Sequence, residues 1–188
     1  MNEIMILCNK TNLDFYEVIR LAKTKWNFLN FNPGLVGGHC LPVDPYYLSY
    51  FASKFNFKTK VTLAGRDINN FMEKFILNKI FSKINRLNNL RKKRIVVIGL
   101  TYKPNVADLR NSLAMNIFKN LKKKYINTKN YDPIIEPEIA KKLKIGLDPT
   151  IARRSDIFIF LVKHKRVSAI YEYAKKNKKI IIDPLSRL

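Results

Sequence analysis

The chain has 188 residues, of which 47% are hydrophobic and 12% aromatic, and it carries a net charge of +22. This composition excludes an intrinsically disordered protein, and the length is sufficient for one large domain or two small ones. The lysines lie singly or in twos and threes, as on solvated helix faces, which disfavours a specific nucleic-acid binder. The same charge is compatible with a basic pocket for a small polyanion such as a diphosphate.

The cysteines and the first residues of the chain indicate a cytoplasmic protein. Cys8 and Cys40 stand in different sequence contexts, and their spacing matches neither a zinc site nor a disulfide framework. Residues 1–10 lack the basic start and the long apolar core of a signal peptide. No apolar run approaches the roughly 20 residues that cross a bilayer, so no membrane partner is predicted.

The first half of the chain is predicted to be helical. Residues 1–24 should form two short helices with a break at residues 9–12, the second helix beginning at Asp14. After an irregular loop, Asp44 and Pro45 are predicted to cap a short helix that ends at Ala52. A helical pattern then runs over residues 62–88 with apolar residues on more than one face, which fits an interior helix and a subunit interface equally well.

From residue 91 onwards, predicted strands alternate with predicted helices. The strands are expected at residues 94–99, 128–131, 156–162 and 179–183. The helices are expected at residues 112–124, 136–144 and 167–176. This alternation predicts an α/β fold with right-handed crossovers around a parallel sheet. Ligands of such sheets bind beyond the carboxyl ends of the strands. The segments expected on that rim are residues 99–110, 131–133, 163–164 and the tail after Asp183.

The loop over residues 33–48 is the most informative stretch of the chain. It places Cys40 among three glycines and three prolines, with Asp44 four residues later. Glycines allow close approach of the backbone to a ligand, and prolines fix the turns. A cysteine in a stiff polar loop beside His39 is presented for chemistry, although a free cysteine is also often buried and inert.

This loop resembles the active-site segment of the nucleotide-sugar 6-dehydrogenases, the UDP-glucose/GDP-mannose dehydrogenase family. The longer stretch 25–48 resembles the branch that acts on UDP-N-acetylhexosamines. Further similar motifs follow in order at residues 65–72, 99–104, 108–112, 131–133 and 162–164. The resemblance covers essentially the whole chain and implies the C-terminal portion of such an enzyme. It implies a central helical dimerisation segment over residues 1–90 and a Rossmann-like UDP-binding domain over residues 91–188.

The resemblance also implies the chemistry, which serves surface polysaccharide biosynthesis. Two hydride transfers to NAD turn the C6 hydroxyl of the sugar into a carboxylate. Cys40 attacks the intermediate aldehyde to form a thiohemiacetal, which is then oxidised to a thioester. A thiolate suits this role because it is nucleophilic near neutral pH and leaves well from the acyl intermediate. Asp44 matches the carboxylate that positions or activates the hydrolytic water, with helix capping as its structural alternative. His39 either assists the thiolate or orients the loop.

Substrate-binding residues follow from the same resemblance. The glycine amides that would face the sugar and the diphosphate belong to Gly34, Gly37 and Gly38. The strip that covers the UDP-sugar corresponds to Phe28, Leu29 and Asn30, with one extra residue before the cysteine compared with the UDP-glucose branch. The nucleotide pocket corresponds to Tyr102 and Lys103, whose structural alternatives are a strand-end turn and a surface lysine. Arg66 could reach a substrate carboxylate or a neighbouring subunit, or cap its helix. Arg187 lies where the family often has a uridine-contacting arginine, although its surroundings match poorly.

Two departures from the family pattern limit what the chain can do alone. It contains no G-x-G-x-x-G fingerprint, so NAD has no evident site. The family's catalytic lysine and asparagine belong to a helix upstream of Met1. The first predicted helix also lacks a capping residue, which indicates a truncated product or an alternative start, or else a frayed native terminus.

We therefore expect the C-terminal part of a UDP-N-acetylhexosamine 6-dehydrogenase, inactive by itself. It would pair with a separately encoded N-terminal half that binds NAD, and form a homodimer through the long helix. The first alternative is a non-catalytic UDP-sugar-binding and dimerisation module. The second is a polyanion or nucleic-acid binder, which would require binding that depends steeply on salt.

Overall fold

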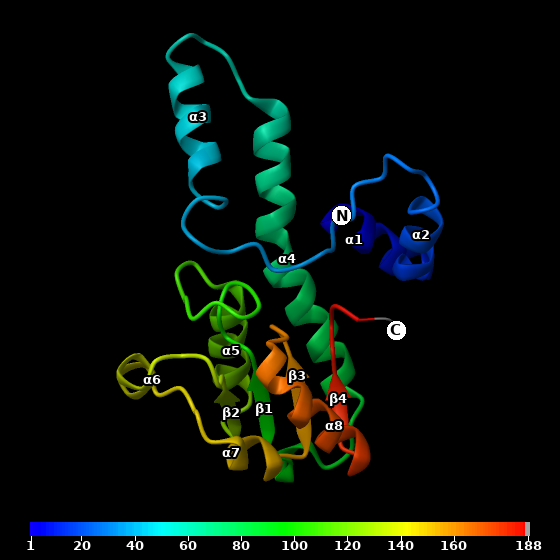
Figure 1. Cartoon of the computed structure of the whole chain (residues 1–188), viewed down its shortest axis with the longest axis vertical. Helices are drawn as coiled ribbons and strands as arrows, with labels where there is room; N and C mark the ends of the chain where they lie inside the picture. The colour runs from blue at the N-terminus through cyan, green and yellow to red at the C-terminus, as the bar shows by residue number, and fades with distance from the viewer. Residues whose placement is uncertain (187–188) are drawn as a thin grey trace.

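The computed structural model describes residues 1–186, with only the backbone described at residue 91. Four helices, α1 to α4, form a helical part, and the elements from β1 onwards form a sheet part (Figure 1). The long helix α4 (Lys60–Asn85) runs from the top of Figure 1 down to the sheet and links the two parts. Within the described residues, no helix combines the length and the apolar character needed to span a membrane.

The helices near the N-terminus follow the predicted order. Helix α1 (Asn2–Thr11) ends at Asn12, which has a left-handed backbone with φ 56°. Helix α2 (Phe15–Ala22) begins after Asp14, whose side chain accepts hydrogen bonds from two backbone amides of the first turn. The break between the two helices is therefore shorter than the expected residues 9–12, because α1 continues to Thr11.

Helix α3 (Asp44–Ser53) differs from the prediction at its start. Asp44 is the first helical residue, and the N-cap is Val43, which makes no side-chain cap hydrogen bond. The prediction that Asp44 caps this helix is therefore wrong. Its carboxylate still lies in the first turn, where a negative charge interacts favourably with the helix dipole. Pro45 occupies the first turn, where its missing N–H costs no helical hydrogen bond.

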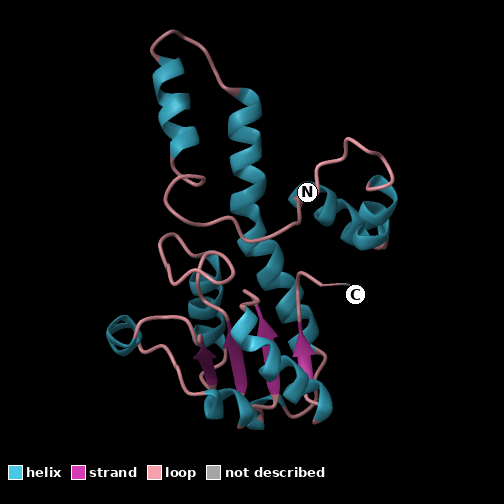
Figure 2. Ribbon diagram, viewed as in Figure 1, coloured by secondary structure: helices cyan, strands magenta, loops and turns pink. Residues whose placement is uncertain are grey.

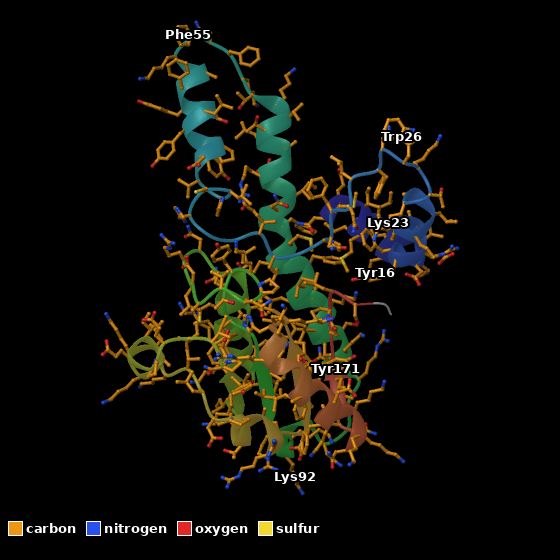
Figure 3. All side chains as sticks on the ribbon, in the orientation of Figure 1. Tyr16, Lys23, Trp26, Phe55, Lys92 and Tyr171 are labelled. Carbon is orange, nitrogen blue, oxygen red and sulfur yellow. The ribbon has the colours of Figure 1, made fainter. Side chains whose placement is uncertain are left out.

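Helix α3 and the first half of α4 form a projecting arm, which we call the α3–α4 arm (Figure 3). No residue of α3 is buried. The side chain of Ser49, in the middle of α3, bonds to that of Thr59, the N-cap residue of α4, at 2.6 Å. Phe55 lies at the tip of the arm, 69% exposed. The arm therefore leaves a contiguous set of large apolar side chains uncovered.

The sheet part is a four-stranded parallel sheet (Figure 2). Its strands are β1 (Ile95–Ile98), β2 (Thr128–Tyr131), β3 (Ile157–Phe160) and β4 (Ile180–Ile182), in the order β2-β1-β3-β4. The connecting helices are α5 (Leu113–Lys124), α6 (Pro137–Leu143), α7 (Pro149–Arg153) and α8 (Ser168–Lys176), with short 3-10 helices at Leu90–Lys92 and Lys165–Val167. This confirms the predicted α/β fold. Helix α7 was not predicted, although Asp148 caps it and Pro149 begins it.

The sheet has a hydrophobic core on each face. Alternate strand residues point to opposite faces, so Val97 and Ile159 join one core while Val96 and Phe158 join the other. The first core also contains three fully buried side chains from the second half of α4, namely Ile76, Ile80 and Ile84. The long helix is thus an interior helix over its second half and an exposed one along the arm.

Asp156 links the amino ends of three strands. Its carboxylate accepts the backbone N–H of Arg94 at 2.8 Å and lies 3.7 Å from the ammonium of Lys179. The pKa of Asp156 is lowered first by the Arg94 amide and then by the charges of Arg94 and Lys179. A carboxyl group with a lowered folded pKa stabilises the fold above its unfolded pKa, and this contribution is lost as the pH falls through the folded pKa.

We therefore expect Asp156→Asn to lower the free energy of unfolding by about 1 kcal/mol at neutral pH. The difference from the unchanged chain should shrink as the pH falls below the unfolded pKa of 3.8, and it should disappear below the lower folded pKa, where the native carboxyl is protonated as well. Urea titrations at neutral and acidic pH measure this, with the exposed Asp67→Asn as the matched control. An equal difference at both pH values would contradict the assignment.

Candidate active-site loop and nucleotide rim

The loop that carries Cys40 is attached to the helical part through Asn2. The amide group of Asn2 bonds Gly34 twice, accepting its N–H at 2.8 Å and donating to its carbonyl oxygen at 3.0 Å. The same amide donates to Asn69 of α4 at 2.8 Å. Asn2 is 7% exposed. This buried asparagine was missed from the sequence, because no local pattern indicates a partner so distant along the chain.

The same loop is attached to the sheet part through Gly37 and Gly38. The N–H of Gly38 donates to the carbonyl oxygen of Arg110 at 3.0 Å, and the side chain of Asn111 donates back to the carbonyl oxygen of Gly38 at 2.8 Å. A Cβ on Gly37 would lie 2.7 Å from the Asn111 carbonyl oxygen and 2.8 Å from Cβ of Tyr102. The two glycines thus allow the loop to approach Tyr102 closely.

Cys40 and Asp44 lie on one turn of the chain. The carbonyl oxygen of Cys40 accepts the N–H groups of Val43 and Asp44, both at 2.9 Å. Cys40 is an exposed free thiol, whereas Cys8 is buried in the core. The structure therefore brings the predicted nucleophile and the predicted carboxylate together on a rigid turn that faces solvent.

Arg110 is a charged neighbour of this turn that the prediction did not include. It forms an ion pair with Asp108, with Nη2 and Oδ2 separated by 2.6 Å. The pKa of Arg110 is raised chiefly by its hydrogen bond to Asp108, with smaller contributions from Tyr102 and Cys40. The pKa of Asp108 is lowered first by Arg110 and to a smaller degree by His39.

Tyr102 and Lys103 lie on the predicted rim, just after β1. Tyr102 is half-buried against Gly38, and the Lys103 ammonium lies 5.5 Å from the centre of the Tyr102 ring. The preceding turn depends on Gly99, which has φ +79°. Its neighbour Leu100 donates its N–H to the carboxylate of Asp132 at 2.7 Å. A ring and a mobile cation are thus presented at the carboxyl end of the central strands, where parallel sheets bind ligands.

The remaining predicted residues lie elsewhere. Phe28 packs against the core, while Leu29 and Asn30 are exposed. Arg66 is 5% exposed within α4 and donates from Nη2 to Asn70 at 2.8 Å. Its place in the interior of α4 excludes the helix-capping alternative. Its Nε atom is buried without a hydrogen-bond partner. Arg187 lies outside the described residues.

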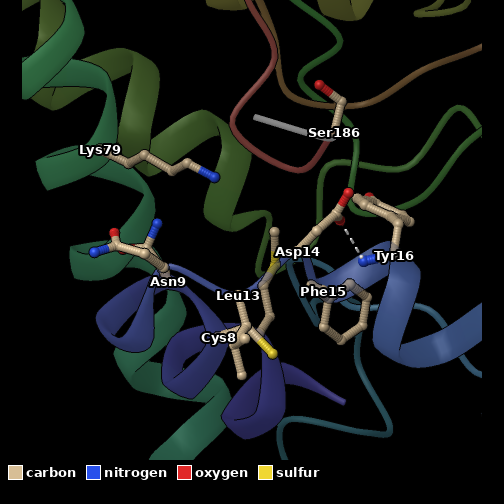
Figure 4. Close-up of a pocket in the computed structure, with 10 residues that line it drawn as sticks. Cys8, Asn9, Leu13, Asp14, Phe15, Tyr16, Lys79 and Ser186 are labelled. Atoms are coloured by element: carbon tan, nitrogen blue, oxygen red, sulfur yellow. Dashed lines mark hydrogen bonds between the residues drawn. The ribbon is translucent and has the colours of Figure 1, made fainter.

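A separate pocket of about 230 Å³ lies between α1, α2, α4 and the chain after β4 (Figure 4). Lys79 lines it and donates to the carbonyl oxygen of Pro184 at 2.9 Å, and the Tyr16 hydroxyl donates to that of Leu185. Burial is the first cause that lowers the pKa of Lys79. The predicted site residues do not line this pocket. Its polar groups instead fasten the last described residues to the helical part.

The helical segment thus docks its cysteine loop on the carboxyl-end rim of a small parallel sheet, and both parts match models of one protein family. Residues 1–71 match the central domain of the UDP-glucose/GDP-mannose dehydrogenase family, and residues 96–187 match the UDP binding domain of the same family. The chain therefore belongs to the UDP-glucose/GDP-mannose dehydrogenase family.

Individual relatives agree with this assignment. The chain is 40% identical over 169 residues to Protein CapL of Staphylococcus aureus, across 88% of this chain and 40% of the relative. It is 34% identical over 170 residues to UDP-N-acetyl-D-glucosamine 6-dehydrogenase of Salmonella typhi, again across 88% of this chain and 40% of the relative. The solved structure of UDP-D-ManNAc dehydrogenase from Pyrococcus horikoshii is 26% identical, with a TM-score of 0.74 over 93% of this chain and 40% of that one. The chain thus spans about 40% of the length of these relatives.

Proposed function

We propose that this chain is the cysteine-bearing and UDP-binding part of an NAD-dependent UDP-N-acetylhexosamine 6-dehydrogenase. The observation that carries the proposal is the docking of the Cys40 loop onto the nucleotide rim through Gly38, Arg110 and Asn111. A thiol held beside a nucleotide site can reach the sugar of a bound UDP-sugar. The names of the Salmonella and Pyrococcus relatives point to an N-acetylhexosamine as that sugar.

In this proposal Cys40 is the nucleophile that captures the sugar. Its thiolate adds to the C6 aldehyde: a sulfur–carbon bond forms, the carbonyl π bond breaks and the oxygen takes up a proton, which gives a thiohemiacetal. Loss of a hydride to NAD supplied by another polypeptide would turn this adduct into a thioester. Water would then attack the thioester, and the thiolate would leave as the carboxylate forms. Asp44, on the same turn as Cys40, is the group proposed to orient that water.

The residues described here do not fit an NAD site. The described strands form one parallel sheet, and its first strand leads into Gly99-Leu100-Thr101-Tyr102 in place of a glycine-rich dinucleotide turn. We therefore propose that NAD, the acceptor implied by the resemblance, is bound by a separate N-terminal half. The division into residues 1–90 and 91–188 belongs to the same proposal.

A homodimer through the α3–α4 arm is the proposed assembly. The exposed apolar side chains of the arm include Tyr47, Phe51, Phe55, Phe57 and Val61. Such a patch on a projecting arm is typical of a surface that a second polypeptide covers. A second copy of this chain presents the same arm, which is the requirement for a two-fold interface.

Calorimetry of the chain with UDP tests the binding half of the proposal. We expect Lys103→Ala to weaken UDP binding about tenfold, because a charge-assisted contact to a phosphate is lost. Lys92→Ala, at the opposite end of the sheet (Figure 3), is the matched control and should leave the affinity within about twofold. Equal affinities of Lys103→Ala and Lys92→Ala for UDP would show that the nucleotide does not bind at Lys103.

The non-catalytic UDP-sugar-binding module is the second candidate, and the poor fit to NAD favours it. It makes the same calorimetric prediction but differs when an NAD-binding half is added. The catalytic proposal requires NADH formation in that mixture, whereas the second candidate requires UDP-sugar binding without turnover.

A further inference from the structure

The imidazole of His164 contacts both ends of the segment that carries Tyr102 and Lys103. At one end, the backbone N–H of Asn105 donates to Nδ1 of His164 at 2.9 Å. At the other end, Nε2 of His164 lies 3.4 Å from the hydroxyl of Thr101 and 3.2 Å from the carboxylate of Asp132. One side chain thus spans the five residues that present the nucleotide-facing ring and ammonium.

These contacts determine which ring nitrogen carries the proton. Nδ1 accepts an N–H from Asn105, so it holds a lone pair. Nε2 then carries the hydrogen and donates it toward Asp132. The Thr101 hydroxyl donates to the carbonyl oxygen of Lys103 at 3.0 Å, which leaves its own oxygen free to face Nε2. Each polar atom in the cluster therefore has a compatible role.

The position of the ring excludes direct contact with a ligand. The side chains of His164 and Asp132 are both 0% exposed. Asp132 is held in turn by the N–H groups of Leu100 at 2.7 Å and Ile134 at 3.2 Å. A buried, fully bonded ring can influence binding only through the backbone it holds.

The segment is also tied down from its exposed side. Asn105 has a left-handed backbone, φ 61°, and its side-chain oxygen accepts the N–H of Lys165 at 2.8 Å. Tyr102, between the two anchors, packs on Gly37 and Gly38 of the cysteine loop. Displacement of the segment would therefore move both the nucleotide contacts and the surface on which the Cys40 loop docks.

We infer that His164, held by Asp132, is a positioning residue for UDP-sugar binding, which fixes the backbone of residues 101–105 so that Tyr102 and Lys103 face the nucleotide. The inference rests on the proposed function for the identity of the ligand. Its structural half, the anchoring of the segment by Nδ1, holds independently of any ligand.

Two substitutions separate the two nitrogens. His164→Asn keeps an acceptor near the place of Nδ1, whereas His164→Gln keeps a donor near the place of Nε2 and loses that acceptor. We expect His164→Gln to weaken UDP binding about five- to tenfold, which corresponds to one hydrogen bond, and His164→Asn to stay within about threefold. Amide hydrogen exchange at Asn105 should accelerate in His164→Gln alone. The midpoint of urea unfolding, measured for both variants, reports the purely structural effect.

The outcomes distinguish this inference from the proposed function. UDP affinity in His164→Gln equal to that of the unchanged chain, or equal losses in both variants that follow their stability, would overturn the positioning role. Failure of the unchanged chain to bind UDP would count against the proposed function, and exchange at Asn105 would still decide the anchoring. If neither variant folds, Asp132→Asn, which weakens the hydrogen bond that orients Nε2 of His164, should weaken UDP binding about threefold. Unchanged affinity there would overturn the inference as well.

Discussion

Cys40→Ser is expected to lower the rate of uronate formation from a UDP-N-acetylhexosamine by at least about a thousandfold. The serine hydroxyl stays protonated at neutral pH, so it captures the C6 aldehyde poorly, and no thioester can form. The assay uses a hybrid in which the N-terminal part of Staphylococcus aureus CapL precedes this chain, because the two are 40% identical over the shared region. NADH absorbance is followed with the UDP-activated forms of N-acetylglucosamine, N-acetylmannosamine and N-acetylgalactosamine.

Cys8→Ala is the matched control for this experiment. Cys8 is 3% exposed and packs in the core of the helical part, so its loss should reduce stability and leave the rate per folded molecule unchanged. Retention of more than about a tenth of the activity in Cys40→Ser would contradict a covalent role for this thiol. An inactive unmodified hybrid with a folded loop would favour the non-catalytic module.

Gly99→Ala is expected to have the largest effect on stability, a loss of about 3–5 kcal/mol. Gly99 has φ +79°, and a Cβ added there would lie 2.0 Å from the carbonyl oxygen of Val162. That oxygen belongs to the backbone at the end of the neighbouring strand, so it cannot move aside as a flexible side chain could. Small domains have a total stability of about 5–15 kcal/mol, so the variant should be largely or wholly unfolded at moderate temperature.

Gly65→Ala is the matched control, since Gly65 lies within α4 and a Cβ there meets no atom within 4 Å. Alanine in an open helical position should raise the free energy of unfolding by about 0.5–1 kcal/mol. Urea denaturation followed by circular dichroism measures both variants. Similar stabilities for the two would show that the turn after β1 can rearrange.

Strands β1, β3 and β4 were predictable because each is a short run of apolar residues. Residues 95–98 and 157–160 are fully buried in the structure, as a continuous apolar run indicates. The boundary of α3 was not predictable, because Val43 caps the helix without a side-chain bond and Asp44 resembles a cap from sequence. Helix α7 is only five residues long, too short for a hydrophobic period to be visible.

The site was predictable only in part, because its segments are joined by contacts between residues that lie far apart in the sequence. The loop and the rim could each be identified from their own residues, but the hydrogen bond between Gly38 and Arg110 joins positions 72 residues apart. No local pattern encodes such a contact. Asn2 and His164 were overlooked as positioning groups for the same reason, since their roles depend on Gly34 and Asn105, far along the chain.

The two attachments of the cysteine loop have a mechanical consequence. Gly34 is bonded to the helical part and Gly38 to the sheet part, and only three residues separate them. The four steps from Gly34 to Gly38 extend to roughly 14 Å at most, so this short tether cannot absorb a large rotation of one part against the other. The thiol, two residues after Gly38, is therefore held at the nucleotide rim, and a large rotation between the two parts would first have to break one of these attachments.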